Sequence, residues 1–202
     1  MGITGNDCDC QVLYGLREAQ FRALSTAGAS VPAGDWYATD CPVTASVAPE
    51  IEEGAKSDLK CGDVIKNSMK ADDQLTGVKV DFAMGCRNPL IEFIIAGSVG
   101  TVIYDGSSPP CAIGFCPPTL AEQANARPFE MRLYQSEKSG SSDIGYAETW
   151  LYQCLPSFVN TGSAQEEYAT QEWSISAVEN SNYAAGVDKP VYCWSVLAAI
   201  PV

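Results

Sequence analysis

Carboxylates and cysteines are the residue types here that could do chemistry, because the chain contains no histidine. Without histidine there is no Ser-His-Asp or Cys-His nucleophile system, and most zinc hydrolase sites are excluded. Two adjacent acidic pairs, Asp72-Asp73 and Glu166-Glu167, could hold a metal or act on a sugar. Neighbouring residues of a strand point to opposite faces, so neither pair converges on one ligand by itself. Carboxylates from distant segments could still meet, but no residue pattern predicts a catalytic site, and we expect no enzyme activity.

Phosphate and metal motifs are also missing from the sequence. There is no G-x4-G-K-[ST] phosphate loop and no G-x-G-x-x-G after a strand pattern. The tightest cysteine spacings, Cys8-Asp-Cys10 and Cys111-x4-Cys116, differ from the C-x2-C pairs of zinc fingers. An acidic region does not match the calcium-binding EF-hand loop and also holds four lysines, so it is expected to be a charged hairpin. Its aspartates are Asp58, Asp63, Asp72 and Asp73. We therefore expect no metal and no cofactor.

The nine cysteines are many for a protein expected in the cytosol, where stable disulfides are disfavoured. Their odd number also means that they cannot all pair with one another. We expect most of them to be small buried apolar side chains.

The net charge of −13 argues against binding to DNA or RNA phosphates, which requires clustered lysine and arginine. Residues 139–188 contain seven acidic residues and no basic one. This stretch is either an ordinary solvated acidic face or a surface that repels a polyanion passing close by. The first residues lack the pattern of a signal peptide, and no apolar run reaches the ~20 residues of a membrane span. We expect synthesis in the host cytosol and no membrane association.

Alternating apolar and polar residues predict strands over much of the chain. In residues 77–84, Val78, Val80, Phe82 and Met84 share one face, which is the period-2 pattern of a half-buried strand. Similar alternation occurs in residues 129–134 and 171–178, and residues 146–154 and 191–198 are further strand candidates. Residues 105–118 hold four prolines and are expected to form a long irregular loop. Residues 1–35 read as an N-terminal arm or lead-in with a possible short helix at 14–24.

A short helix is predicted at about residues 88–97. Asn88 can cap its free N–H groups, Pro89 suits the first helical position, and Gly97 favours a stop. The helix is nearly all apolar, so most of its sides should be covered. Together with seven or more strands, it predicts a mostly β fold. We expect a single β-sandwich or barrel domain over residues 36–202, with one flanking helix, long assembly loops and the arm of residues 1–35.

Three segments, taken in order, resemble the major tail (tube) proteins of long-tailed bacteriophages, particularly those of actinobacterial hosts. The first is residues 77–97 (GVKVDFAMGCRNPLIEFIIAG). The second is residues 129–135 (FEMRLYQ), followed after a Gly/Ser loop by residues 146–153. The third is residues 154–160 (CLPSFVN), with EWSI at 172–175 and Asn182-Tyr183. The resemblance lies in the order and texture of elements rather than in an invariant motif.

The resemblance implies a structural virion protein without catalytic residues. Its subunits would form rings, usually of six, that stack into a tail tube, the conduit for genome delivery. Such a tube would contain a tape-measure protein before DNA passes through without specific binding. It would be assembled in the host cytoplasm and located in the virion tail. Asp72, Asp73 and Asp81 are candidates for the lumen, and the helix residues Leu90, Ile91, Phe93, Ile94 and Ile95 for a subunit interface.

Two other classes fit parts of the same pattern. A tail terminator or head decoration protein would share the acidic, β-rich and assembling character, but would stop at a closed ring or a surface patch. A carbohydrate-binding module could use some of the nine Tyr, four Trp and six Phe residues as a sugar platform. Most of these aromatic residues occupy alternating strand positions, which favours a role in the core.

Overall fold

The computed structural model describes residues 12–25, 35–39, 41–61, 64–139, 142–162, 170–183 and 187–201. It confirms a mostly β fold with two short helices. The first half contains β1 (Val12–Ala23), β2 (Tyr37–Thr39), β3 (Pro42–Glu52), β4 (Lys56–Cys61), β5 (Val64–Lys70), β6 (Gln74–Met84) and α1 (Pro89–Ile95). The second half contains β7 (Thr101–Tyr104), β8 (Ala112–Cys116), α2 (Leu120–Gln123), β9 (Phe129–Ser139), β10 (Ser142–Cys154), β11 (Asn160–Gly162), β12 (Thr170–Ala177), β13 (Asn180–Tyr183), β14 (Val187–Lys189) and β15 (Tyr192–Leu197).

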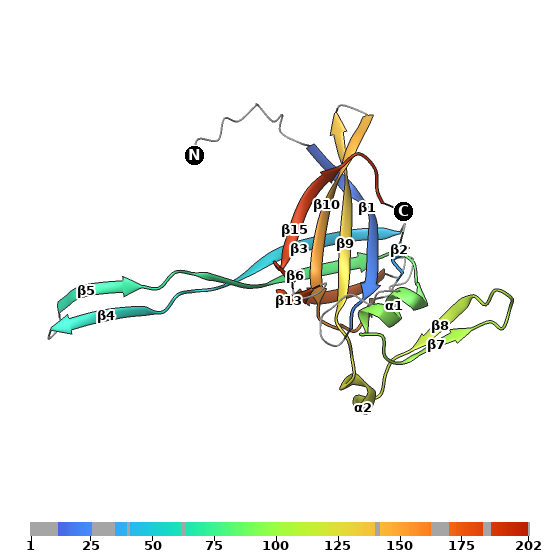
Figure 1. The fold of residues 1–202 in the computed structure, drawn as a ribbon, viewed down its shortest axis with the longest axis horizontal. Helices are drawn as coiled ribbons and strands as arrows, with labels where there is room; N and C mark the ends of the chain where they lie inside the picture. The colour runs from blue at the N-terminus through green and yellow to red at the C-terminus, as the bar shows by residue number, and fades with distance from the viewer. Residues whose placement is uncertain are drawn as a thin grey trace.

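Nine of the strands form one antiparallel sheet that folds into two layers. The five-stranded layer has the order β2-β1-β9-β10-β15, and the four-stranded layer has the order β3-β6-β12-β11. The layers are joined at a corner, where Cys154 of β10 pairs with Ala177 of β12. Strands β1, β9 and β10 run steeply across β3 and β6 (Figure 1). The layers therefore pack as a sandwich of crossed sheets.

The core lies between the two layers and follows the period-2 pattern of the sequence. The predicted face of β6 is buried, and β12 adds Trp173, Ile175 and Ala177. The rings of Phe21 and Phe82 meet edge to face at 5.5 Å, and Phe82 stacks on Trp173 at 5.8 Å. Each fully buried large apolar side chain contributes about 1.5–3 kcal/mol, so this contact holds the layers together.

Helix α1 forms where the sequence predicts it. The Asn88 side chain accepts hydrogen bonds from the N–H groups of Leu90 at 3.1 Å and Ile91 at 3.4 Å. The helix ends before Gly97, whose φ of +87° is a conformation that glycine adopts without strain. The helix closes one end of the sandwich, where Ile91 and Ile95 are fully buried.

The expectation of a helix at residues 14–24 is wrong, because this segment forms strand β1. The strand pairs with β9 along most of its length, so it belongs to the sheet rather than to a lead-in. Ala19 and Phe21 enter the core while Gln20 and Arg22 lie on the other face. Pairing with β9 outweighs the local helical tendency. Residues 1–11 and 26–34 of the expected arm lie outside the described residues.

Residues 105–118 are only partly the irregular loop that the prolines predict. Strand β8 lies within them and forms a hairpin with β7. Helix α2, which the sequence reading missed, follows directly and has a capping box. The Thr119 hydroxyl accepts from the Glu122 N–H, and the Glu122 carboxylate accepts from the Thr119 N–H at 2.7 Å. The T-x-x-E pattern at residues 119–122 is the sequence signature of a capping box, so it could have predicted this helix.

Candidate assembly surface

The outer face of the four-stranded layer is polar and exposed. Thr44, Ser46 and Ala48 come from β3, and Lys79 and Asp81 from β6. Strand β12 adds Glu172, Ser174 and Ser176. All eight side chains are exposed, and apart from Lys79 and Glu172 all are small. The opposite face of the same strands carries the core, so β-strand alternation separates a buried face from an exposed polar one.

Asp81 lies on this polar face, as the lumen hypothesis requires. Hydrogen bonding to Ser174 and then to Lys79 holds the pKa of Asp81 below its usual range. Its carboxylate lies 3.2 Å from the Lys79 ammonium. A shallow depression of about 360 Å³ runs between Asp81 and Glu172. The face therefore presents two carboxylates and one ammonium, a small net negative charge.

Asp72 and Asp73 lie elsewhere, before the start of β6. Both are exposed, and Asp81 follows seven residues into the strand, roughly 23 Å further along it. The Asp73 carboxylate accepts from the Gly54 N–H at 2.9 Å and pairs with Lys70 at 2.9 Å. Lys70 first, and then Gly54, hold the pKa of Asp73 below its usual range. These contacts hold Asp73 at the base of the β4–β5 hairpin. Because Asp72 and Asp73 lie far from Asp81 along the strand, the three aspartates do not form one site.

Both ends of the four-stranded layer are strand edges within the described part of the chain. Strand β3 pairs with β6 alone, and the short strand β11 pairs with β12 alone. Pro42 and Pro49 lie in β3, as expected for an edge strand, since proline has no N–H to donate. Between them, residues 43–48 are free of proline, which leaves six residues able to pair with another strand.

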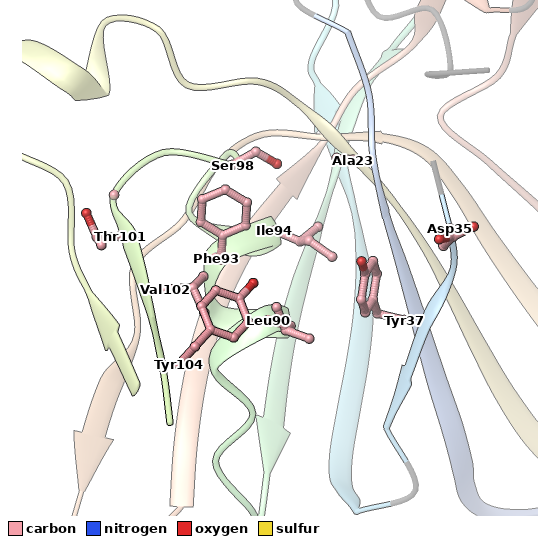
Figure 2. Close-up of a pocket in the computed structure, with 11 residues that line it drawn as sticks. Ala23, Asp35, Tyr37, Leu90, Phe93, Ile94, Ser98, Thr101, Val102 and Tyr104 are labelled. Atoms are coloured by element: carbon pink, nitrogen blue, oxygen red, sulfur yellow. The ribbon is translucent and has the colours of Figure 1, made fainter. Parts of the chain in front are cut away.

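The five helix residues predicted for an interface are divided by the structure. Ile91, Ile94 and Ile95 belong to the core of the single chain, while Leu90 and Phe93 are only partly buried. The latter two line a groove of about 500 Å³ between α1, β2 and β7. Figure 2 shows Leu90 and Phe93 beside Val102 and Tyr104 of β7, with Tyr37 of β2 across from them. Leu90 and Phe93 therefore remain candidates for a subunit interface, because they contribute to a partly exposed apolar surface.

The outer face of the five-stranded layer carries a stack of cations and aromatic rings that sequence reasoning missed. The Arg132 guanidinium lies 4.1 Å from the Trp36 ring and 3.8 Å from the Trp150 ring. Arg22 lies 4.5 Å from Trp36 on the same face. Trp150 in turn stacks on Tyr152 at 4.7 Å. The sequence did contain a signal for this cluster, because Arg22, Arg132 and Trp150 alternate with core residues along β1, β9 and β10.

Two carboxylates are buried within this cationic cluster. Arg22 Nε donates to Glu130 at 2.8 Å, and burial raises the pKa of Glu130 despite this partner. Glu148 accepts from the Tyr134 hydroxyl at 2.9 Å and from the Ser195 hydroxyl at 3.1 Å. Neither carboxylate can meet a substrate, because both are enclosed by protein. The cluster therefore encloses two carboxylates among arginines and aromatic rings.

The four tryptophans do not form a sugar platform. Trp173 is in the core, and Trp36 and Trp150 have cations over their faces. Trp194 of β15 is the exposed one, at 69%. The tryptophans therefore do not favour the carbohydrate-binding alternative, although the rings of Tyr37, Tyr104 and Phe158 are exposed.

The acidic stretch of residues 139–188 does not make one surface. Glu148 is buried and Glu172 lies on the polar face, while Glu166-Glu167 lies outside the described residues. The expectation of mostly buried cysteines is also wrong for the six whose state the structure gives. Only Cys154 is buried, and Cys41, Cys111, Cys116 and Cys193 are exposed.

Within the described residues, no three acidic or cysteine side chains gather as metal ligands. No helix in that part of the chain is both long enough and apolar enough to cross a membrane. Comparison with known proteins found no matching family model and no significant match among curated proteins. The geometry of the surfaces therefore carries the functional proposal.

Proposed function

We propose that this protein is the tail-tube subunit of a long-tailed bacteriophage, a structural protein whose copies form rings that stack into a hollow tube. The observation that carries the proposal is the four-stranded layer. One face of it is core, and the other is polar with mostly small side chains. Within the described residues, the strand at each of its edges pairs on one side only. A sheet of this kind is suited to continue from copy to copy as the wall of a barrel.

Ring closure follows from the two edges. Strand β3 of one copy would pair with the β11 edge of the next, through the proline-free residues 43–48. Such head-to-tail pairing uses two different surfaces of each copy. The ring closes when the rotation from one copy to the next is a whole fraction of a full turn. The resemblance to tail-tube proteins implies six copies. Closure also removes exposed strand edges, which otherwise invite uncontrolled aggregation.

The polar face would then line the lumen. Asp81 and Glu172 give it a negative charge, and small side chains such as Ser46 and Ser174 keep it smooth. A wall with the same sign of charge as DNA lets the genome pass without binding. A tape-measure protein would occupy the lumen before ejection, and the assembled protein would belong to the virion tail.

The second candidate is a tail terminator or head decoration protein. The structure favours stacking over a closed end because the molecule has different features at its two extremes. The β4–β5 hairpin extends from one end, and α1 with the β7–β8 hairpin lies at the opposite end (Figure 1). Two different ends can join head to tail without limit, whereas a terminator must stop.

Negative-stain electron microscopy of the purified protein over a range of concentrations tests the proposal. We expect hollow tubes or stacked rings of uniform width. Variant Val43→Lys should abolish them, because it places a charge on the edge strand at a half-exposed side chain. Val43→Thr is the matched control and should assemble. Compact monomers at every concentration and salt condition would overturn the proposal.

A further inference from the structure

Two cavities beside helix α1 share three lining residues, Arg87, Glu92 and Phe115. The first has a volume of about 280 Å³ and is bounded by α1, β8, α2, residues 157–159 and β12. The second has a volume of about 320 Å³ and is bounded by α1 and the β7–β8 hairpin. A charged pair between apolar walls is the usual composition of a small-molecule site, and neither cavity belongs to the strand edges or the polar face on which the proposed tube depends.

Glu92 is a buried carboxylate with one oxygen still to be paired. The residue is 5% exposed, and its Oε1 accepts hydrogen bonds from Gln171 Nε2 at 2.7 Å and from Arg87 Nε at 3.3 Å. Its second oxygen, Oε2, accepts none from the residues that the structure describes. The Oε1 atom of Gln171, a residue only 2% exposed, likewise has no donor in the described part of the chain. This polar centre therefore has more acceptors than donors, which favours a ligand that carries several N–H groups.

Arg87 supplies the opposite charge beside Glu92. Its side chain is 67% exposed, and its contact with Glu92 is made through Nε alone. The two terminal nitrogens of its guanidinium group pair with no residue among those described. Such a guanidinium fork binds a carboxylate through two parallel N–H···O bonds. The pair thus presents an available cation and an available anion side by side.

Apolar side chains and a fixed backbone form the walls of the first cavity. Ser157 holds the loop on one side, because its N–H donates to the Ile95 carbonyl at 2.9 Å and its hydroxyl donates to the Ser174 carbonyl at 2.8 Å. On another side, the Phe115 ring meets Phe93 of α1 edge to face at 6.3 Å. The cavity is therefore formed without a ligand, which lowers the ordering cost of binding. The apolar lining residues are Phe115, Pro117, Phe158, Val159 and Trp173.

We propose that this site binds the zwitterion of a free α-amino acid with an apolar side chain. The ammonium group donates to Glu92 Oε2, the carboxylate accepts from the terminal nitrogens of Arg87, and the side chain lies against Phe115 and Phe158. An amine without a carboxylate would place a second positive charge beside Arg87, and a carboxylate without an ammonium group would place a second negative charge beside Glu92. A metal ion fits less well, because no three acidic or cysteine side chains gather anywhere in the described ranges.

Equilibrium dialysis of radiolabelled L-leucine against the purified full chain tests the proposal. We expect one saturable site per chain with a Kd of about 1 mM or lower. Two competitors that each lack one charged group, 3-methylbutylamine and 4-methylpentanoate, should displace leucine at least about tenfold more weakly than unlabelled leucine does. The assay measures binding to free and assembled chains alike, so its result is separate from whether tubes form.

Variants of the charged pair locate the binding. Arg87→Gln should weaken leucine binding at least about tenfold and remove the advantage of leucine over 3-methylbutylamine. The side chain of Arg87 is largely exposed, so the fold should be kept. Arg127→Gln, at an exposed arginine that lines neither cavity, is the matched control and should bind leucine as the unchanged protein does.

Glu92→Gln should weaken leucine binding by a similar factor, because it removes the partner of the ammonium group. Circular dichroism checks its fold, and if this buried variant does not fold, the result for Arg87→Gln alone decides. Three results would each overturn the proposal. They are no saturable binding up to about 10 mM leucine, undiminished binding in Arg87→Gln, and displacement by 3-methylbutylamine as strong as that by leucine.

Discussion

Glu130 shows how a single buried residue makes stability depend on pH. Burial raises its pKa above the ordinary value, and Arg22 offsets only part of that effect. The folded state therefore binds the proton more tightly than the unfolded state does. The contribution of Glu130 to the free energy of unfolding is full below the unfolded pKa and is lost as pH rises through the folded pKa.

This reasoning predicts the behaviour of Glu130→Gln, which cannot titrate. As pH falls from about 7 to about 4.5, the unchanged protein should gain stability relative to this variant. Urea unfolding at several pH values measures the difference. Glu179→Gln, which makes the same substitution at an exposed glutamate, is the control for removing a carboxylate. A difference between the unchanged protein and Glu130→Gln that does not vary with pH would contradict the role given to burial.

Arg132 stabilises the outer face of the five-stranded layer through two aromatic rings and a carboxylate. Its guanidinium lies between Trp36 and Trp150 and 3.6 Å from Glu148. Arg132→Met should cost about 3 kcal/mol, because it leaves a buried carboxylate without its cation. Arg132→Lys keeps the charge but not the planar stack and should cost about 1 kcal/mol. Urea unfolding followed by tryptophan fluorescence checks both, and equal losses in the two variants would argue against the stacking contribution.

Sequence could place individual residues only where a strand alternates cleanly. The pattern of residues 77–84 put Asp81 on the polar face of β6, and the structure agrees. The alternation could not show that Asp72 and Asp73 lie apart from Asp81, because their positions depend on where strand β6 begins. Nor could it foresee the stack of Arg132, since the three segments that form it are joined only by sheet pairing.

Among the elements, the β4–β5 hairpin depends on one close approach of two backbones. At its base the Ala71 N–H donates to the Ala55 carbonyl at 3.0 Å. A Cβ added to Gly54 would lie 1.8 Å from the Ala71 carbonyl oxygen, so only glycine fits there. Gly54→Ala should therefore separate the two strands at the base of the β4–β5 hairpin.

Hydrogen exchange measures this effect element by element. In Gly54→Ala, amide exchange in residues 56–70 should become faster by roughly tenfold or more, while exchange in the core strands β6 and β12 stays unchanged. Gly114→Ala in the other hairpin is the control, since its added Cβ would make an ordinary contact of 3.4 Å with Ile103. Equal protection of the β4–β5 hairpin in both variants would show that the close approach does not hold its two strands together.

Elements with strong local signals were predictable and those fixed by distant partners were not. Helix α1 has a cap, a first-turn proline and a stop glycine in sequence, and it forms as predicted. Strand β1 reads locally as helix, but its ladder with β9 determines its conformation. Strand β8 lies among prolines and exists because β7 pairs with it. Tertiary pairing outweighed local propensity in both cases.

At the scale of the whole molecule, the described part of the chain pairs the two edge strands of the four-stranded layer, β3 and β11, on one side only. In the proposed assembly these two edges would close a ring. An assembly built in this way places the polar face of β3, β6 and β12 toward a central channel. That placement is the central claim, because it connects the fold to the passage of DNA.

Cryo-electron microscopy of the assembled protein tests this claim most directly. We predict a hollow tube whose inner wall is a continuous barrel of β3, β6, β12 and β11 from every copy, with Asp81 facing the channel. A tube lined instead by the five-stranded layer or by α1, or an assembly without a channel, would contradict the account.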